Sequence, residues 1–334
     1  MLDFVDAWLN AGIWVGIVLI IFGFIALIKG ADWLVDGASA IAKRFGISDL
    51  VIGLTVVAFG TSMPEFVVNM ISVAHGSTDL AITNILGSNI INTFVILGLT
   101  AAIYPIATQQ RSRDFDIPMS ILAGVAVVVI IFLRPVITSQ DKGIDYIGGI
   151  ILLLIFIYFI YNTFRHAKDH PEDPNVDEVT VKPISPLKSI LFILCGLAGL
   201  VIGGELIVKS AVNFANRLGV SEAIIGLTIV ALGTSLPELA TSVIAAYKHN
   251  SDIAIGNVFG SNIFNVFFIL GTSAIINPLP AYEGIEIDAV MAASGAIITW
   301  LVIKSNHERK VTRWGGIILL LAYSCYLTYR LLMV

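Results

Sequence analysis

The segment GLTVVAFGTSMPE, Gly53–Glu65, recurs as GLTIVALGTSLPE, Gly226–Glu238, and each copy ends on a glutamate. Counterpart residues are separated by 173 positions, since 226 − 53 = 173 and 238 − 65 = 173, and the downstream GSN motifs keep this offset. Between Gly53–Gly98 and Gly226–Gly271, 24 of 46 aligned positions are identical without any gap. The chain is therefore an internal duplication.

The composition of the chain is that of a polytopic membrane protein. Of its 334 residues, 57% are hydrophobic and only 13% are charged, against about a quarter charged in soluble domains. Asp3 and Asp6 stand where a cleaved signal peptide would be basic, so we expect the first apolar stretch to be retained. Apolar stretches long enough to cross a bilayer begin near Gly12, Leu50, Leu80, Ile117, Ile144, Leu187, Ala223, Ile253, Ile287 and Trp314.

Ten spans divided between two copies give five per copy, so the second copy must enter the membrane from the opposite face. We predict an all-α integral membrane protein with ten transmembrane helices in two inverted five-helix repeats and broken helices at the midplane. The repeats are residues 1–164 and 188–334, and a hydrophilic linker, 165–187, divides them. Its acidic residues lack the spacing of a calcium-binding EF-hand loop, so an ordinary solvated linker is favoured.

The distribution of basic residues predicts the orientation. With the N-terminus outside, thirteen Lys and Arg side chains fall on the inner side and five on the outer side, while Lys29 lies within the first span. Because cytoplasmic loops carry the excess of basic residues, we expect both termini outside and the linker in the cytoplasm.

Pro64 predicts a helix break inside the second span. It has no N–H group and its ring clashes with the carbonyl four residues earlier, so carbonyls near Ala58 and Gly60 are expected to lose their partners. Such freed groups are tolerated within a membrane only where they are buried in protein or line a wet cavity. Glu65 lies beside the break, so we prefer a polar site to a simple proline kink with a hydrogen-bonded glutamate.

Polar side chains also recur at every fourth position in the third and eighth spans, which places them on one helical face. They are Asn84, Ser88 and Asn92 in the first copy, and Asn257, Ser261 and Asn265 in the second. One such row could serve helix–helix hydrogen bonding, but two rows that each follow a GTSxPE break favour a shared site. Asn89 and Asn262 lie off the rows and are weaker candidates, expected either to support the site ligands or to serve packing.

The oxygen-rich composition of this region favours a hard cation. Two carboxylates, hydroxyl and amide oxygens and freed carbonyls suit Ca²⁺, which accepts six to eight oxygen ligands, better than Mg²⁺, which dehydrates reluctantly. An empty site with two ionised glutamates would be costly at low dielectric. The pair should hold one divalent ion, several monovalent ions or protons, and this mutually exclusive occupancy is what an antiporter needs.

At these residues the chain resembles the cation/calcium exchanger superfamily, most closely its prokaryotic sodium/calcium exchangers. The resemblance implies exchange of internal Ca²⁺ for external Na⁺ across the cell membrane by alternating access, with helices one and six sliding against the rest. It also implies that no cofactor is needed and that a monomer functions. The ion ligands it implies are the carbonyls of Ala58 and Ala231 and the side chains of Thr61, Ser62, Glu65, Ser88, Asn92, Thr234, Ser235, Glu238, Ser261 and Asn265.

One residue departs from the family pattern. The best-known members carry an aspartate at the position of Asn265, so this site has two carboxylates instead of three. The number of Na⁺ ions bound together, the stoichiometry and any proton sensitivity therefore stay open.

Several alternatives remain at this point. A calcium/proton exchanger or a potassium-dependent sodium/calcium exchanger would share the fold, and an ion channel belongs to a different class. An intramembrane hydrolase is disfavoured because neither glutamate has a histidine partner, so the chain is not expected to be an enzyme. The net charge of −5 gives no basic surface for nucleic acid.

Three features outside the motifs also carry expectations. The first span should continue as one long tilted helix past its apolar part. Asp32 and its counterpart Glu205 are expected to be interfacial or helix-pairing charges, with an accessory role in an ion pathway as the alternative. Cys195 and Cys325 lie in apolar runs and are expected to be buried and unbridged.

Overall fold

The computed structural model describes residues 13–138, 142–169, 184–218, 231–282, 284–305 and 307–333. Within these ranges it has seven helices long and apolar enough to cross a membrane, or eight if one bent pair counts as a span. The seven are Trp14–Phe45, Thr78–Ile103, Ser112–Leu133, Tyr146–Lys168, Pro186–Ala215, Ser251–Ile276 and Ile285–Ser305. The protein is thus an all-α membrane protein, as predicted.

The other three expected spans fall on the bent pair and on the parts of the chain that contain two further helices. The bent pair is Asp49–Thr61 with Met63–Ala74. Helix α13 (Leu236–Tyr247) follows α12 (Ala231–Thr234), before which residues 219–230 lie outside the described ranges, and α17 (Arg313–Met333) is the last helix. The total of ten spans remains a prediction.

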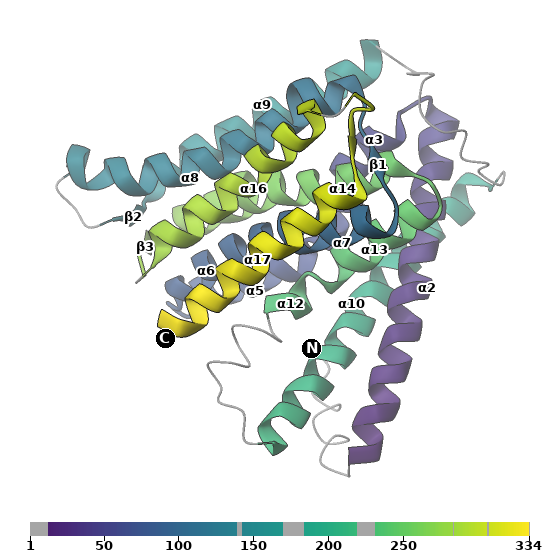
Figure 1. Ribbon diagram of the computed structural model, residues 1–334, viewed down its shortest axis with the longest axis horizontal. Helices are drawn as coiled ribbons and strands as arrows, with labels where there is room; N and C mark the ends of the chain where they lie inside the picture. The colour runs from purple at the N-terminus through teal and green to yellow at the C-terminus, as the bar shows by residue number, and fades with distance from the viewer. Residues whose placement is uncertain are drawn as a thin grey trace.

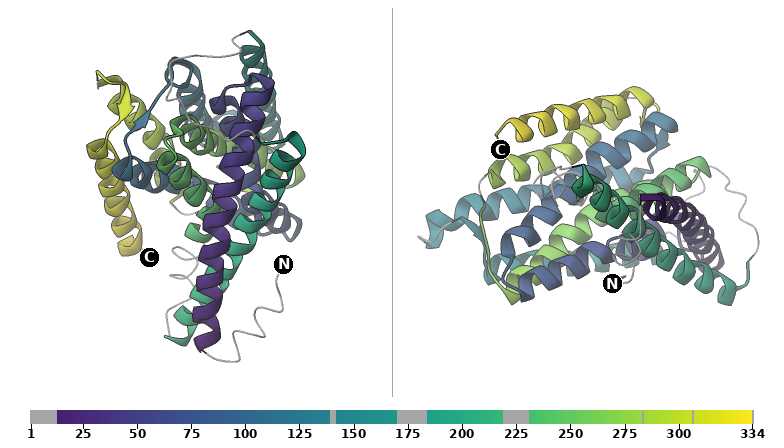
Figure 2. Two further views of the ribbon diagram at one scale, coloured as in Figure 1. Left: turned by 90° about the vertical axis from the view of Figure 1, so that its right-hand side faces the viewer. Right: turned by 90° about the horizontal axis from the view of Figure 1, so that it is seen from below.

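Two long helices pack together against the rest of the bundle. These are α2 (Ile13–Phe45, 33 residues) and α10 (Pro186–Arg217, 32 residues), and at 1.5 Å per residue each is about 50 Å long. They run side by side and cross the remaining helices steeply (Figures 1 and 2). The expectation that the first span continues as a single helix through its amphipathic part is confirmed.

Glycines bring the backbones of α2 and α10 into contact. A Cβ on Gly30 would lie 2.7 Å from the carbonyl oxygen of Gly196, and one on Gly23 would lie 2.9 Å from that of Gly203. Small residues permit this close approach between membrane helices. The two helices therefore form one closely packed pair, called the α2–α10 pair below.

The two most deeply buried spans cross the centre of the bundle. One joins α6 (Thr78–Ile90), η2 (Ile91–Ile96) and α7 (Leu97–Ile103), and the other joins α14 (Ser251–Ile263), η5 (Phe264–Leu270) and α15 (Gly271–Ile276). Their most apolar stretches are 78% and 94% buried, against 33% and 22% in the α2–α10 pair. Each contains a π-helical segment, η2 or η5, that begins one residue after its GSN motif.

The remaining spans pack around these two. They are η3 (Ser112–Asp116) continued by α8 (Ile117–Thr138), α9 (Tyr146–Asp169), α16 (Ile285–Ser305) and α17. Helix α8 packs against α16, and α7 packs against α17. Phe94, Phe259 and Phe267, which are fully buried, belong to the core shared by these helices.

Short antiparallel strand pairs join the connections at the two ends of the bundle. At one end β1 (Ile106–Ala107) pairs with β4 (Lys310–Val311), and at the other β2 (Gly143–Ile144) pairs with β3 (Leu279–Pro280) (Figure 1). The register sets Ile106 opposite Val311. Connections far apart in sequence thus meet on the same side of the protein.

Both ends of the expected linker, 165–187, are helical: α9 continues to Asp169 and α10 begins at Pro186, while residues 170–183 lie outside the described ranges. One expectation needs correction, because Cys195 and Cys325 are exposed and not buried. An apolar run in a membrane protein does not distinguish a face packed on other helices from a face that meets lipid, because both are apolar.

Candidate functional site

Both copies of the GTSxPE motif break their helix at the serine. Ser62 (φ −83°, ψ 7°) separates α4 (Ala58–Thr61) from α5 (Met63–Ala74), and the two halves of this span are bent by 46°. Ser235 (φ −88°, ψ 5°) separates α12 (Ala231–Thr234) from α13. The proline that follows each serine lies in the first turn of the next helix, where backbone N–H groups have no partner within the helix, so the missing N–H costs no hydrogen bond. The predicted break is confirmed in both copies.

The carbonyl groups at the first break differ from the expectation. Ala58 O is not freed, because the N–H of Ser62 donates to it at 3.0 Å and the Thr61 hydroxyl lies 3.3 Å from it. Because Pro64 has no N–H, it is the carbonyl of Gly60, four residues earlier, that loses its helical donor, and not the carbonyl of Ala58. Ala58 also follows a π-helical segment, η1 (Gly53–Val57), that the motif did not predict. In the second copy, Gly226–Val230 lie outside the described residues.

Glu65 is fully buried and accepts hydrogen bonds from both halves of the chain. Ser88 of α6 and Ser235 of the second break each place a hydroxyl 3.4 Å from Glu65 Oε1. The hydroxyl of Thr234 also interacts with this carboxylate. A glutamate of the first copy is thus held by the broken helix of the second.

Glu238 repeats this arrangement with the halves exchanged. It is fully buried, and its Oε1 accepts hydrogen bonds from Ser62 at 2.9 Å and from Ser261 at 3.4 Å. The second oxygen of each glutamate, Oε2, is buried and has no hydrogen-bond partner. The two carboxylates lie close enough to repel each other. Buried anionic oxygens without partners are costly, and a cation between them would relieve both the desolvation and the repulsion.

Two asparagines on the π-helical segments add further unpartnered atoms. Asn92 of η2 and Asn265 of η5 are fully buried. Neither polar atom of the Asn92 amide has a partner, and Asn265 Oδ1 has none, although Asn265 Nδ2 donates to Asn89 Oδ1 at 3.0 Å. Native proteins satisfy nearly all buried polar groups, so these free amide atoms are available to a ligand or a water.

The two polar rows are not equivalent in the structure. Asn257 accepts a hydrogen bond from Thr61 Oγ1 at 3.0 Å and donates to the backbone oxygen of Glu238 at 3.1 Å, so it ties one break to the other. Asn84, its counterpart, donates instead to Asn69 Oδ1 at 2.8 Å. The difference follows from residue 69, an asparagine where the second copy has Ser242, whose hydroxyl also accepts from Asn257.

The off-row asparagines join the two central spans, as expected. Asn89 Nδ2 donates to the backbone oxygen of Asn262 at 3.1 Å, and Asn262 Nδ2 donates to Thr93 Oγ1 at 2.7 Å. Asp32 bears out the expectation of a helix-pairing charge, whereas Glu205 pairs within its own helix. Lys248 Nζ lies 2.6 Å from Asp32 Oδ1, and Lys209 Nζ lies 3.9 Å from Glu205 Oε1.

No cluster of three or more His, Cys, Asp or Glu side chains that could hold a metal occurs within the described ranges. The acidic centre is the Glu65–Glu238 pair, and the remaining groups around it are neutral hydroxyls and amides. Such a site is suited to a hard cation that can be released, since few charges hold it.

Comparisons with known proteins agree with this chemistry. The family described as sodium/calcium exchanger protein matches residues 15–165 and 188–332. The putative antiporter CaxA of Alkalimonas amylolytica is 36% identical over 93% of this chain and 97% of its own length. The sodium/calcium exchanger MaX1 of Methanosarcina acetivorans is 33% identical over 94% of this chain and 97% of its own. The structure of the sodium–calcium exchanger NCX_Mj, soaked with zero Na⁺ and Ca²⁺, superimposes with a TM-score of 0.81 at 31% identity and covers 95% of this chain and 99% of that one.

Proposed function

The chain belongs to the sodium/calcium exchanger protein family, and we propose that it is a secondary active antiporter that exchanges Ca²⁺ for Na⁺ across the cell membrane by alternating access. Homology over nearly the whole length to exchangers supports this reaction. It is a transporter and not an enzyme, and Ca²⁺ and Na⁺ are its substrates.

The observation that carries the proposal is the pair of reciprocally held glutamates. Glu65 and Glu238 are buried together, each is oriented by a serine from the other half, and each keeps one oxygen without a partner. Two negative charges neutralise one Ca²⁺ or are shared by several Na⁺. Because both cations need the same oxygens, binding of one excludes the other, and this competition couples the two fluxes.

The proposed ion site extends beyond the glutamates. Hydroxyl and amide oxygens supply the neutral ligands that Ca²⁺ needs to reach six to eight oxygens. The side chains already gathered at the glutamates, together with the unpartnered amides of Asn92 and Asn265, support this assignment. The proposed ligands are Ala58 (carbonyl), Thr61, Ser62, Glu65, Ser88, Asn92, Ala231 (carbonyl), Thr234, Ser235, Glu238, Ser261 and Asn265.

We further propose that residues 1–164 and 188–334 form two inverted five-helix repeats joined by the linker 165–187. The two separate matches to the family, the reciprocal Ser–Glu contacts and the meeting of distant connections in the β1–β4 and β2–β3 pairs support this arrangement. The charge distribution supports both termini outside and a cytoplasmic linker. Because one chain supplies both halves of the site, a monomer within the lipid bilayer suffices for exchange.

Uptake of radioactive Ca²⁺ into proteoliposomes tests the function. Vesicles loaded with Na⁺ should take up Ca²⁺ when they are diluted into Na⁺-free buffer, whereas vesicles with no ion gradient should not. A K⁺ gradient and a pH gradient, each imposed alone, test the potassium-dependent and proton-coupled alternatives. Ca²⁺ uptake driven by a K⁺ or pH gradient and not by a Na⁺ gradient would overturn the assignment. So would Ca²⁺ uptake that needs no gradient of another ion, because that is what a channel shows.

A further inference from the structure

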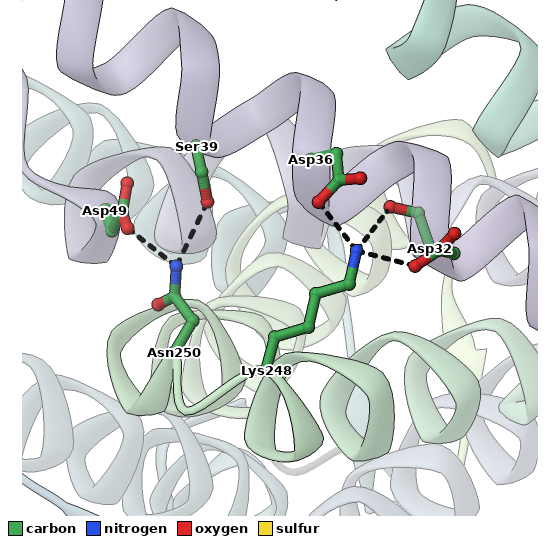
Figure 3. A network of polar contacts seen from close by, with 6 residues as sticks. All are labelled: Asp32, Asp36, Ser39, Asp49, Lys248 and Asn250. Carbon is green, nitrogen blue, oxygen red and sulfur yellow. Dashed lines mark hydrogen bonds and ion pairs between the residues drawn. The ribbon is translucent and has the colours of Figure 1, made fainter. Parts of the chain in front are cut away.

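A charge cluster holds α2 against the corner between α13 and α14, away from the ion site. Lys248 follows the last residue of α13, and its Nζ lies 2.6 Å from Asp32 Oδ1 and 2.6 Å from Asp36 Oδ1 (Figure 3). The same ammonium donates to the backbone oxygen of Asp32 at 3.0 Å. Asp32 and Asp36 stand one turn apart on α2, so a single lysine engages two successive turns of the helix.

Asn250 extends the contact along α2 and into the next helix. Its Nδ2 donates to Ser39 Oγ at 3.0 Å and to Asp49 Oδ2 at 2.6 Å (Figure 3). Its Oδ1 accepts from the N–H of Ile253 at 3.0 Å and so caps α14. These hydrogen bonds order the corner between α13 and α14 and join it to α2. A shift of α2 along α13 would break the contacts that Lys248 and Asn250 make with α2.

The α2–α10 pair is not placed symmetrically over the two breaks. A Cβ on Gly60 would clash with Leu197 and one on Gly233 with Val208, so α10 covers both breaks. Phe24 of α2, the counterpart of Leu197 since 197 − 173 = 24, is 46% exposed. The duplicated sequence thus holds two different local arrangements. In transporters built from inverted repeats, movement of one part against the other around a fixed site gives alternating access. In the second state of the cycle, the first break would then have the local arrangement that the second break has here, and the second break that of the first.

The charges of the cluster do not follow the duplication. Subtracting or adding 173 relates Lys248 to His75, and Asp32 and Asp36 to Glu205 and Lys209. Lys209 therefore places a positive charge on α10 where α2 carries Asp36, and it pairs with Glu205 on its own helix at 3.9 Å. When the two arrangements exchange, the corner at His75 would meet Glu205 and Lys209 of α10. These residues cannot place a lysine between two carboxylates, so the contact made by Lys248 has no equivalent there.

We infer that Lys248 is a positioning residue for exchange: it clamps α2 in the arrangement described here through Asp32 and Asp36, and the opposite arrangement lacks this clamp. The inference rests on the proposed antiport, since only a cycling transporter uses both arrangements. The clamp makes the two states unequal in population although the helices that form them are duplicated. Under the proposed topology, the clamp lies on the cytoplasmic side.

Thiol labelling at Ser39 tests the clamp without reference to the transported ion. Ser39 is 3% exposed at the α2 corner, and Ser39→Cys keeps its size. In a background of Cys195→Ser and Cys325→Ser, Lys248→Gln should raise the rate of maleimide labelling by about fivefold, as for loss of a partly exposed ion pair. Lys248→Arg should restore the slow rate, and Lys168→Gln, at an exposed lysine of α9, is the matched control. Equal rates in Lys248→Gln and the control overturn the clamp, and so does failure of arginine to restore the slow rate.

A transplanted clamp provides the second test. The double variant His75→Lys with Lys209→Asp gives the other half a lysine and two acidic residues, Glu205 among them. It should also raise labelling at Ser39→Cys, although Lys248 is intact, because it stabilises the opposite arrangement. An unchanged or slower rate would overturn the inference. Uptake of Ca²⁺ measured in the same proteoliposomes tests the proposed function separately.

Discussion

Ser62 Oγ lies 2.9 Å from Glu238 Oε1, so the break in the first half of the chain donates its serine hydroxyl to the glutamate of the second half. The reciprocal contact joins Ser235 to Glu65 at 3.4 Å. The two breaks therefore orient each other's carboxylates. Neither half can form its part of the site alone, and the serines are the most direct place to test this interlock.

Ser62→Ala and Ser235→Ala should each weaken Ca²⁺ binding by about tenfold, because each removes a hydroxyl that orients a carboxylate and can ligate the ion. Titration calorimetry on purified protein measures the affinity. Ser120→Ala, at a buried serine of α8, is the control and should bind as the wild type. Affinities equal to the control would show that the breaks do not shape the site.

Glu65→Gln and Glu238→Gln should each abolish Ca²⁺ transport while the protein remains folded. The loss of one charge leaves a divalent ion half neutralised in a low-dielectric site, and breaking a buried charge pair costs about 3–5 kcal/mol. Proteoliposome uptake is the measurement. Glu286→Gln, at a glutamate that pairs with Lys142 at the end of the bundle, should transport normally. Retained exchange in either site variant would remove that glutamate from the site.

Asn257→Ala should weaken Ca²⁺ binding more than Asn84→Ala does. Asn257 fixes the Thr61 hydroxyl and the backbone of Glu238, whereas Asn84 bonds to Asn69, which the site does not use. Loss of a buried amide that makes such bonds costs about 1–3 kcal/mol, which predicts roughly tenfold weaker binding. Melting temperatures of both variants separate loss of stability from loss of affinity. Equal affinities would assign Asn257 to packing.

Asn265→Asp should raise the Hill coefficient with which Na⁺ inhibits Ca²⁺ binding. Several Na⁺ ions facing two carboxylates carry net positive charge into a low-dielectric cavity, where charge interactions are several-fold larger than in water. A third carboxylate would compensate this charge and, crowded by two others, would add a proton-sensitive step. Sodium titrations at two pH values measure both effects. Superimposable curves for wild type and variant would show that position 265 does not set Na⁺ occupancy.

Single cysteines at exposed serines test the orientation. Ser305→Cys should react with impermeant thiol reagents only from the cytoplasm, and Ser77→Cys only from outside. Both variants need the background without Cys195 and Cys325, which are exposed. Labelling of both cysteines from one side would refute the five-plus-five inversion.

Features set by local chemistry could be predicted from the sequence. Pro64 fixes a break because its ring and missing N–H act within one turn. The duplication gives Glu65 and Glu238 equivalent positions beside two such breaks, which predicts a shared site. Their burial and the hydroxyls of Ser88 and Ser261 agree with that prediction.

Features that depend on the partner of a residue could not be predicted. The π-helical segments at Asn92 and Asn265 change which residues share a face, and a spacing of four assumes an α-helix. Asn84 and Asn257 have the same sequence context but differ because residue 69 on another helix is an asparagine. The partners of Lys248 lie more than two hundred positions away, beyond any local pattern.

The glycine seam of the α2–α10 pair is self-complementary. Gly23 packs on Gly203 and Gly30 on Gly196, and adding 173 to the first helix converts each contact into the other, since 23 + 173 = 196 and 30 + 173 = 203. Contacts related in this way are those of a two-fold symmetric homodimer. Because the two halves belong to one chain, the backbone contact keeps this symmetry while each half carries its own charges, as Asp36 and Lys209 do, which identical subunits of a homodimer cannot.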